Sequence, residues 1–312
     1  MKKLYMLLVA VLLMVITGCS SGGSDAPPSS AGDYTSALIG TLKYVPAGSF
    51  QRDATSTNIS TVSAFRMSQH EITRAQFLAI MGTDPSDTGY STGTSDPVQS
   101  VNWYHAIAFC NKLSIAEGFT PVYSVTGVDF TTLTYASIPT SGDATWNAAT
   151  ATWTNNGYRL PTEMEWMWAA MGATSDRSNG YTGTGTNTTG YTKGYAGSTE
   201  AGGAQANVGD YAWTLENSSD GTKTVGTAGT TGHPNELGLY DMSGNVWEWV
   251  WDWYDTYPTG TQTDFRGAAS GTPRVVRGGG WDGLASTATV AFRDYYSPNI
   301  QFNSFGFRVV RP

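Results

Sequence analysis

Residues 235–254 read NELGLYDMSGNVWEWVWDWY, and the tryptophans in this stretch recur at every second position. Successive side chains of an extended strand point to opposite faces, so the alternation predicts a strand over 245–254. One face then carries Trp247, Trp249, Trp251 and Trp253. A row of indoles indicates first a hydrophobic core and only second a platform for stacking sugars. The other face carries Val246, Glu248, Val250 and Asp252. Carboxylates there need a partner, and a cation is one candidate.

The composition indicates an acidic, loop-rich globular protein. The chain has 312 residues, a formal net charge of −8, 12% aromatic and 13% charged residues, and 37 glycines. The aromatic content argues against disorder, and the acidic balance argues against a nucleic-acid partner, which would need a basic face. The 2 cysteines exclude a disulfide scaffold and a cysteine-rich zinc site. The length allows one large domain or two small ones.

The N-terminus has the pattern of a secretory signal. Lys2 and Lys3 precede an apolar run over 4–16, which is too short to span a membrane. The small residues that lead to Cys19 resemble a bacterial lipobox, so we expect Cys19 to carry a lipid. The alternative is an ordinary signal peptide with an incidental cysteine. Residues 20–32 are rich in Ser, Gly and Pro, as a tether would be.

These features predict three segments and a location. The segments are a signal peptide over 1–18, a lipid-anchored flexible tether over 19–40, and one folded domain over 41–312. We expect the protein in a bacterial cell envelope, lipid-anchored at the outer-membrane surface, with the lipid as its only membrane contact.

Helix-end signals predict three helices, and the rest reads as short strands and loops. The helices are expected from Thr73 to Gly82 with Gln76 closing a capping box, from Asn102 to about Ala116 before Gly118, and from Thr162 to Gly172 with Glu165 closing a second box. Short strands are expected over 42–45 and 157–160. The Gly/Thr/Ser/Asn-rich stretches 174–205 and 214–232 are expected to be long loops.

Three isolated features carry little functional weight. Cys110 lies in an apolar stretch and reads as a buried small hydrophobe rather than a reactive thiol. The pattern over 89–93 matches a nucleophile elbow, but no apolar strand precedes it and no helix follows. Gly183-Thr184-Gly185 lies in a polar tract and not between a strand and a helix, so it is no dinucleotide loop.

Several motifs together resemble the formylglycine-generating-enzyme (sulfatase-modifying factor) family over residues 42–312. The block from Gly238 to Trp249 is the most specific. The others, in chain order, are VPAG at 45–48, EIT at 71–73, PV at 97–98, VNW at 101–103, YRLPTE at 158–163, RGG at 277–279 and GFR at 306–308. The resemblance implies an α+β, C-type lectin-like fold with few helices, small twisted sheets and much irregular structure.

The enzymes of that family use two cysteines that bind copper and oxygen. Aligned through Arg277-Gly278-Gly279, those positions fall near Gly283 and Ala288, which cannot supply thiolates. A related branch holds iron with histidines, but His70, His105 and His233 match no such spacing. His70-Glu71 also lacks the second histidine of a zinc motif. We therefore expect no catalytic residues and no enzyme activity.

The C-terminal segment is the predicted binding site. Its Tyr, Ser, Asn and Gly content is typical of adaptable binding loops, although composition alone also suits a plain surface loop. With its GFRVVRP ending, the chain also resembles the variable proteins of diversity-generating retroelements. In those systems, template adenines are mutated, so that one surface is diversified. The resemblance makes 274–312 the candidate variable region.

The resemblance implies a set of diversified ligand-binding residues, a scaffold beneath them and a cation site. The ligand set is Asp282, Gly283, Leu284, Ser286, Thr287, Asp294, Tyr295, Tyr296, Ser297, Asn299, Ile300, Phe302, Asn303 and Ser304. The scaffold is Trp281, Arg293, Pro298 and Arg308. A structural calcium is implied at the side chains of Asp241 and Glu248 and the carbonyls of Gly244 and Val246, since calcium takes oxygen ligands.

We therefore predict a surface-displayed lipoprotein that binds an unidentified protein or glycan and performs no chemistry. One alternative is an oxidase of the formylglycine-generating or sulfoxide-forming type, which the missing cysteines and histidines oppose. Another is a structural envelope protein, which would present no exposed aromatic site.

Overall fold

The structure, a computed structural model, describes residues 32–91, 93–174, 185–199, 207–229 and 232–312. Residues 32–312 belong to one compact unit. The predicted signal peptide, Cys19 and most of the predicted tether lie outside the described residues. Within the described ranges, no helix is both long enough and apolar enough to cross a membrane.

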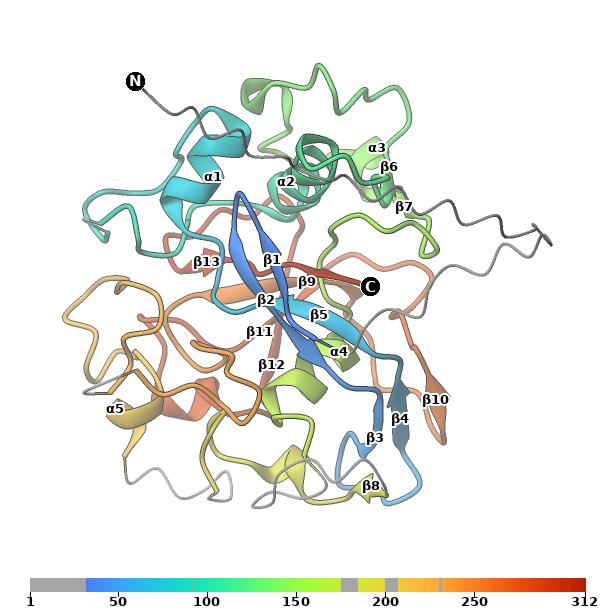
Figure 1. Cartoon of the computed structure of the whole chain (residues 1–312), viewed down its shortest axis with the longest axis vertical. Coiled ribbons are helices and arrows are strands. Elements are labelled where there is room, and N and C mark those ends of the chain that lie inside the picture. The colour runs from blue at the N-terminus through green and yellow to red at the C-terminus, as the bar shows by residue number, and fades with distance from the viewer. Residues whose placement is uncertain (1–31, 92, 175–184, 200–206, 230–231) are drawn as a thin grey trace, which may run out of the picture. The chain divides into compact units, whose positions relative to one another are not determined.

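The tryptophan-rich stretch forms the middle of a sheet, as predicted. Strand β9 (Trp247–Trp253) pairs antiparallel with β11 (Arg274–Arg277) and parallel with β13 (Phe305–Gly306), and β11 pairs with β12 (Arg293–Tyr296). This β12-β11-β9-β13 sheet therefore brings the family motif next to the predicted binding segment (Figure 1).

A second sheet corrects the predicted domain boundary. Its strands, in order, are β1 (Tyr34–Ser36), β2 (Gly40–Val45), β5 (Phe65–Ser68) and β14 (Val310–Arg311). The tether was predicted to run to residue 40, but β1 pairs antiparallel with β2, and Tyr34 lies opposite Leu42. The folded domain thus begins before residue 41, because the start of the presumed tether forms an edge strand.

The remaining strands are short. A third sheet contains β10 (Gln262–Thr263), β4 (Ile59–Val62), β3 (Gly48–Gln51) and β8 (Thr186–Asn187), and β6 (Tyr123–Ser124) pairs with β7 (Thr150–Ala151). The strand predicted over 157–160 is wrong. Arg159 makes only an isolated bridge to Val310. The amides of Tyr158 and Leu160 donate instead to the hydroxyls of Ser114 and Tyr123.

The three predicted helices are confirmed with their caps. They are α1 (Arg74–Met81), α2 (Trp103–Ala116) and α4 (Glu163–Ala170), and each begins with a capping box. The described ranges also hold single turns at α3 (Ala144–Asn147), α5 (Val208–Tyr211), η1 (Tyr135–Ser137), η2 (Gly190–Thr192) and η3 (Ala285–Ala288). Gly82 ends α1 with φ of 73°, a conformation that glycine adopts without strain.

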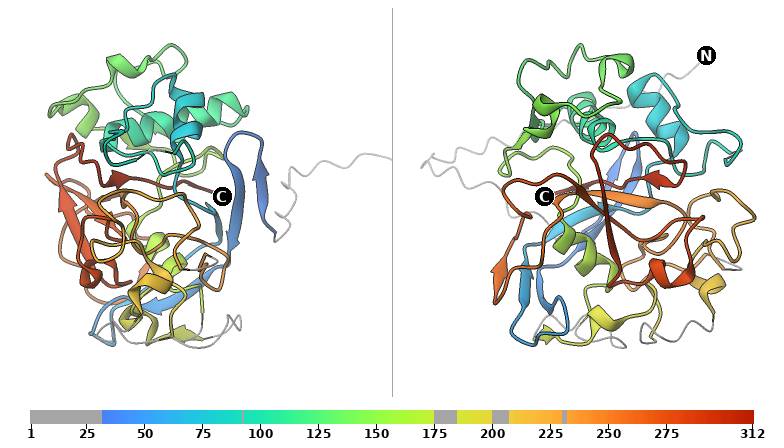
Figure 2. Two further views of the ribbon diagram at one scale, coloured as in Figure 1. Left: turned by 90° about the vertical axis from the view of Figure 1, so that its left-hand side faces the viewer. Right: turned by 180° about the vertical axis from the view of Figure 1, so that it is seen from behind.

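The central sheet separates two apolar cores. Trp249 belongs to the core that contains α2, and Val250 belongs to the core that contains α4. Figures 1 and 2 show α1 and α2 on one side of this sheet and α4 on the other. The tryptophans thus serve mainly as core, as the first interpretation expected. Cys110 is fully buried in the α2 core, and burial raises the pKa of its thiol.

Candidate ligand-binding surface

The described structure exposes many of the predicted ligand-binding residues. The most exposed large side chains among them are Leu284 at 58%, Tyr295 at 47% and Phe302 at 45%. Asp282, Ser286 and Ser297 are also exposed. The half-buried members are Gly283, Thr287, Asp294, Tyr296, Asn299, Ile300 and Asn303. We call Asp282, Leu284, Ser286, Tyr295, Tyr296, Ser297 and Phe302 the C-terminal face.

Ser304 is a correction to the predicted ligand set. Its relative exposure is 1%, and its carbonyl accepts a hydrogen bond from the Trp247 amide at 2.7 Å. Ile300 also has a structural part, because it packs against the α2 core. Ser304 lies directly before β13, which pairs with β9, so tertiary packing buries a side chain whose type suited an exposed loop.

Trp281 has the scaffold role that was expected of it. Its side chain is 5% exposed, and its indole N–H donates to the Asn303 carbonyl at 3.0 Å. Its amide donates to the Asn245 carbonyl at 2.8 Å. Tyr90 stacks on the indole with ring centroids 5.1 Å apart. Trp281 therefore ties the two ends of the binding segment to the family motif.

The backbone of the segment is also anchored at its middle. Pro298, which is buried, accepts a hydrogen bond from the Trp103 amide at 2.9 Å. The Phe302 carbonyl accepts one from the Ser100 amide at 3.0 Å. These bonds join the segment to the start of α2. The face is thus presented by a fixed backbone even though the segment contains little regular structure.

Aromatic rings make up much of the face. Tyr296, Phe302 and the buried Phe305 contact one another edge-to-face, with centroids 4.8–5.6 Å apart. Tyr295 stands beside Tyr254 at 4.1 Å. Partial burial, together with the carboxylates of Asp294 and Asp282, raises the pKa of the Tyr296 hydroxyl. The face therefore combines exposed aromatic surface with acidic groups.

Arg293 is held under the face and not presented by it. Its guanidinium donates to both carboxylate oxygens of Glu163, at 2.8 and 2.6 Å. It also lies over the rings of Tyr254 and Tyr257, 4.4 and 4.2 Å from their centroids. Such paired, stacked geometry suits a guanidinium and fixes β12 to the N-terminus of α4.

On the face of β9 opposite the tryptophans, the buried carboxylate of Glu248 has protein partners. Glu248 and Arg308 both have fully buried side chains. The Nε of Arg308 donates to Glu248 at 2.7 Å, and the Trp166 indole donates to Glu248 Oε2 at 2.7 Å. Arg308 also donates to the carbonyls of Ser68 and Tyr240. Arg308 is thus a scaffold residue, as expected.

The Glu248 carboxylate of the implied calcium site already has protein partners. Both oxygens of Glu248 already accept hydrogen bonds from Arg308. Asp241 Oδ2 accepts the Gly226 amide at 2.6 Å, although Oδ1 has no partner among the described residues. Nowhere in the described ranges do three or more His, Cys, Asp or Glu side chains form a group that could hold a metal. The implied calcium therefore stays a prediction, at a site where a guanidinium already pairs with Glu248.

Gly283 and Ala288, near which the resemblance places the cysteines of the family's enzymes, lie beside the face. Gly283 is half-buried, and Ala288 is 1% exposed at the end of η3. A Cβ at Gly283 would lie 2.7 Å from the Thr287 hydroxyl, so the loop is packed for a glycine. Among the described residues the one cysteine is Cys110, and it lies in the α2 core.

The structure adds neighbours that sequence reasoning missed. Leu215 is 48% exposed, and its amide donates to the Gly283 carbonyl at 2.9 Å. The Ala285 amide donates to Glu216 Oε1 at 3.0 Å. Tyr90, 37% exposed, reaches the same region through its stack on Trp281. These residues come from distant loops, and no local pattern linked them to the C-terminal segment.

The fold and the motifs together define the class of protein. The chain has a C-type lectin-like fold, with few helices and short mixed sheets in the described ranges. Residues 35–312 match the sulfatase-modifying factor enzyme 1-like domain. The chain belongs to this family, which is that of the formylglycine-generating enzymes.

Three relatives illustrate the range of the family. The solved structure of Treponema denticola variable protein 1 has a TM-score of 0.75 and 36% identity, covering 90% of this chain and 99% of that one. Chaperone protein LppX of Paenibacillus barcinonensis is 31% identical over 314 residues, covering 100% of this chain and 99% of the relative. Formylglycine-generating enzyme of Thermomonospora curvata is 34% identical over 172 residues, covering 52% of each.

Proposed function

We propose that this protein is a lipid-anchored, non-catalytic receptor of the cell envelope that binds a protein or glycan partner through the C-terminal face. One observation carries the proposal: exposed Leu284, Tyr295 and Phe302 stand on a backbone fixed by buried Trp281 and Pro298. Aromatic anchors dominate binding energy, and a rigid backbone lowers the entropy lost on binding.

The proposed absence of catalysis is supported by the chemistry of the site. The resemblance places the cysteines of the family's enzymes near Gly283 and Ala288, and neither side chain can hold a metal or transfer electrons. The Cys110 thiol is fully buried and its pKa is raised by burial, which keeps it neutral and unreactive. The oxidase alternative therefore lacks the groups that it needs.

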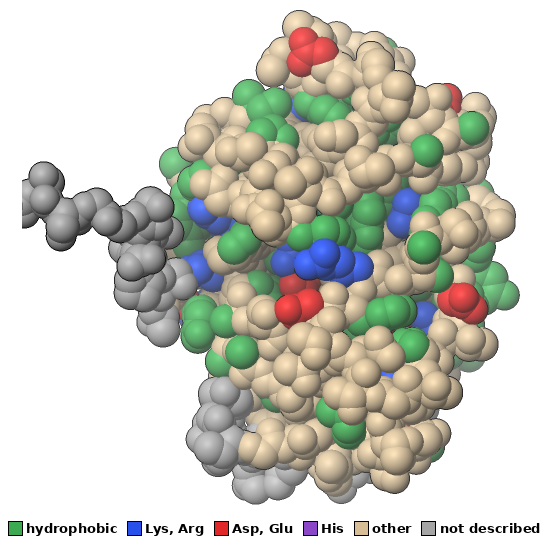
Figure 3. Space-filling model, turned by 90° about the vertical axis from the view of Figure 1, so that its right-hand side faces the viewer, with side chains coloured by type: hydrophobic (Ala, Val, Ile, Leu, Met, Phe, Trp, Pro, Cys, Tyr) green, Lys and Arg blue, Asp and Glu red, His purple; other side chains and the backbone are tan. Residues whose placement is uncertain are grey.

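The character of the face indicates the chemistry of the partner. Asp282 is its charged member, half-buried Asp294 lies next to Tyr295, and Arg293 is already paired with Glu163. The molecule is acidic overall, with a net charge of −8. In the view of Figure 3, basic side chains gather at mid-height and much of the remaining surface is uncharged. We infer a partner with neutral or basic contact groups, and no nucleic acid.

In the variable proteins that this chain resembles, the corresponding surface is diversified. The C-terminal face supports the same proposal here, because its members are exposed while the residues that hold them are buried. Ser304 is excluded from the proposed set, since it is buried. The ligand of a diversified surface cannot be carried over from any relative.

Thermal unfolding tests the proposal. Leu284→Ala, Tyr295→Ala and Phe302→Ala should each cost about 1 kcal/mol or less, because their side chains are largely exposed. Trp281→Ala should cost about 3–5 kcal/mol, because it removes a buried indole and its hydrogen bond. Large losses in all four variants would mean that the segment is core, and the binding face would have to be abandoned.

A second candidate rests on the full-length relative that is named a chaperone. The same face, with exposed Leu284, Tyr295 and Phe302, could hold a partially folded client protein. A chaperone would suppress the aggregation of heat-denatured citrate synthase in solution, and replacing the three side chains by serine would remove the effect. If the protein is instead a receptor for one folded partner, neither the unsubstituted protein nor the serine variant would suppress the aggregation.

A further inference from the structure

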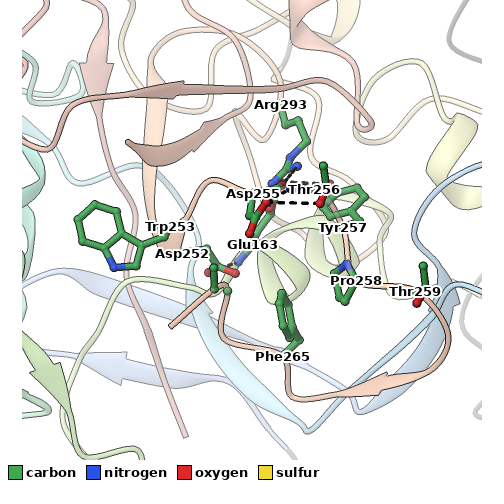
Figure 4. Close-up of a pocket in the computed structure, with 12 residues that line it drawn as sticks. Glu163, Asp252, Trp253, Asp255, Thr256, Tyr257, Pro258, Thr259, Phe265 and Arg293 are labelled. Carbon is green, nitrogen blue, oxygen red and sulfur yellow. Dashed lines mark hydrogen bonds and ion pairs between the residues drawn. The ribbon is translucent and has the colours of Figure 1, made fainter. Parts of the chain in front are cut away.

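A cavity of about 370 Å³ lies on the α4 side of the central sheet, and neither Gly283 nor Ala288 lines it. It is formed where β9 ends, where α4 begins and where the loops 255–259 and 265–268 pass over them (Figure 4). Cavities of 300 Å³ or more are large enough for small organic ligands. The proposed receptor function makes no use of this cavity.

Asp252 lines the cavity and is 1% exposed. Its Oδ2 accepts the Glu163 amide at 2.8 Å, which caps the N-terminus of α4. Its Oδ1 is buried and has no hydrogen-bond partner among the described residues. A buried carboxylate oxygen without a partner is costly, so it calls for a donor from a ligand or a water molecule.

The other carboxylate in the wall, Glu163, is fully engaged. Its oxygens accept from Arg293 at 2.8 and 2.6 Å and from the Tyr257 hydroxyl at 3.1 Å. The Nε of Arg277 approaches it from outside the cavity at 3.5 Å. Asp255, at the exposed rim, adds a third carboxylate to the lining. The lining therefore holds three carboxylates and one guanidinium. Among the described residues of this lining, Asp252 is the carboxylate with a buried oxygen that has no partner.

Apolar and aromatic groups complete the wall. Tyr257, Pro258 and Phe265 lie beside the carboxylates, whereas the Trp253 indole points away from them and lies against the Arg274 guanidinium (Figure 4). Aromatic faces attract cations as well as covering alkyl chains. Gly267 lets the covering loop close: its φ is +81°, and a Cβ there would lie 2.8 Å from the Asp252 Cβ. The loop thus passes directly over Asp252, which only a glycine allows.

We propose that this cavity binds a primary ammonium group on a short alkyl chain, with the ammonium donating to Asp252 Oδ1 and the chain lying against the aromatic wall. An ammonium supplies both the missing hydrogen bond and the positive charge that an acidic cavity favours. An anion would meet Asp252 and Asp255, and a neutral alkyl group would leave Oδ1 without a partner.

Titration of the purified chain with n-butylammonium chloride, followed by ¹H–¹⁵N correlation spectra, tests this. We expect saturable shifts at the Glu163 amide, which is bonded to Asp252, and at the amide of Gly267, which passes over Asp252. The isosteric probes 1-butanol and butyrate should give shifts at least about tenfold weaker at equal concentration. Nα-acetyl-lysine N-methylamide, a mimic of a lysine residue, shows whether the ammonium can come from a protein side chain or only from a free amine.

Two variants decide the role of the carboxylate. Asp252→Asn keeps an oxygen for the Glu163 amide but puts an amide group in place of the free oxygen, so butylammonium binding should be lost. Ala268→Trp fills the cavity and leaves Asp252 unchanged, so it should also abolish binding. Asp264→Asn is the control, because Asp264 hydrogen-bonds to Ser63 outside the cavity lining and the variant should bind normally.

Other outcomes overturn the proposal. If 1-butanol binds as well as butylammonium, the cavity is only an apolar site. If Asp252→Asn still binds, the carboxylate is not the recognition group. If no probe shifts the spectra, water satisfies Oδ1 and the cavity is structural. None of these results bears on the C-terminal face, which the unfolding series tests separately.

Discussion

At the scale of single residues, the Glu248–Arg308 pair shows how this chain uses its buried charges. Both side chains are fully buried, and their hydrogen bonds join β9 to the end of the chain. Removing one charge leaves the other in a dry interior without its counterion, which costs more than the pair itself contributes. Both residues belong to the family motifs, and their contact explains in structural terms why each motif contains its charged residue.

Glu248→Gln should lower the free energy of unfolding by about 3–5 kcal/mol, because Arg308 would remain buried without its carboxylate. Urea denaturation measures the loss. Asp33→Asn is the matched control: it breaks the surface pair with Lys43, where Asp33 is 42% exposed, and should cost about 1 kcal/mol or less. Equal losses in the two variants would contradict the assignment of Glu248 to the core.

Asp241 provides a prediction for pH. Burial raises the pKa of its carboxyl to about 6 from 3.8, helped by Glu248 and opposed by the Gly226 amide and Arg308. The folded state therefore holds this proton more tightly than the unfolded chain does. Its contribution to stability is complete below pH 3.8 and is lost as the pH rises through about 6.

Asp241→Asn removes this titration and keeps an acceptor for the Gly226 amide. Asparagine also tolerates the φ of 53° at this position. Urea unfolding at pH 4 and at pH 7 gives the free energy of unfolding of the variant relative to the unsubstituted protein. This difference should be more favourable to the variant at pH 7 than at pH 4, by about 1–3 kcal/mol. Asp264→Asn, with φ of 44° at the surface, controls for the substitution itself. A gain independent of pH would contradict the account.

At the scale of elements, the sequence predicted helices better than strands. The three helices were found from capping boxes and glycine ends, which are local signals written within a few residues. Strands β8, β13 and β14 are only two residues long and exist because distant segments pair with them. Residues 157–160 looked like a strand, yet side-chain hydroxyls take the amides that a partner strand would have taken.

Thr162→Ala should lower stability by about 1 kcal/mol, because the Thr162 hydroxyl accepts the Glu165 amide at the start of α4. The expected loss is measured by thermal unfolding. Thr145→Ala is the control, since Asp143 and not Thr145 caps α3. No difference between the two variants would mean that the cap of α4 is not needed once the helix is buried.

The candidate site was predictable in part at this scale. Exposed Tyr295 and Phe302 and buried Trp281 agree with what the family resemblance implied. Ser304 could not be told apart from its exposed neighbours, because its burial depends on the pairing of β13 with β9. The cavity at Asp252 was also out of reach, since it needs α4, β9 and two loops to meet. The sequence indicated only that Asp252 would want a partner.

At the scale of the whole molecule, the tryptophan strand organises the fold. One face of β9 supplies the α2 core and the other supplies the α4 core, so a single motif determines both. The folded unit includes residues 34–40, which pair as β1 and the start of β2. The predicted tether is therefore shorter than the composition suggested, because an edge strand of three residues leaves little mark in a sequence.

Attachment to the envelope remains a prediction of the lipobox. Cys19→Ala should abolish lipid attachment and release the protein from the membrane fraction, because a lipid is the anchor that the pattern provides. Metabolic labelling with a palmitate analogue, followed by fractionation and a high-salt wash, measures both effects. Retention of the variant in washed membranes would show that something other than this lipid holds the protein there.

The central claim is that a buried scaffold presents a replaceable C-terminal face, and the DNA around the gene tests it most directly. Sequencing should reveal a near-copy of the region that encodes residues 274–312, differing mainly at adenines of the copy. The differences should fall in codons for the C-terminal face, such as those of Asp282, Tyr295 and Phe302, and spare those of Trp281 and Arg308. The absence of any near-copy, or differences spread equally over buried and exposed codons, would contradict the account.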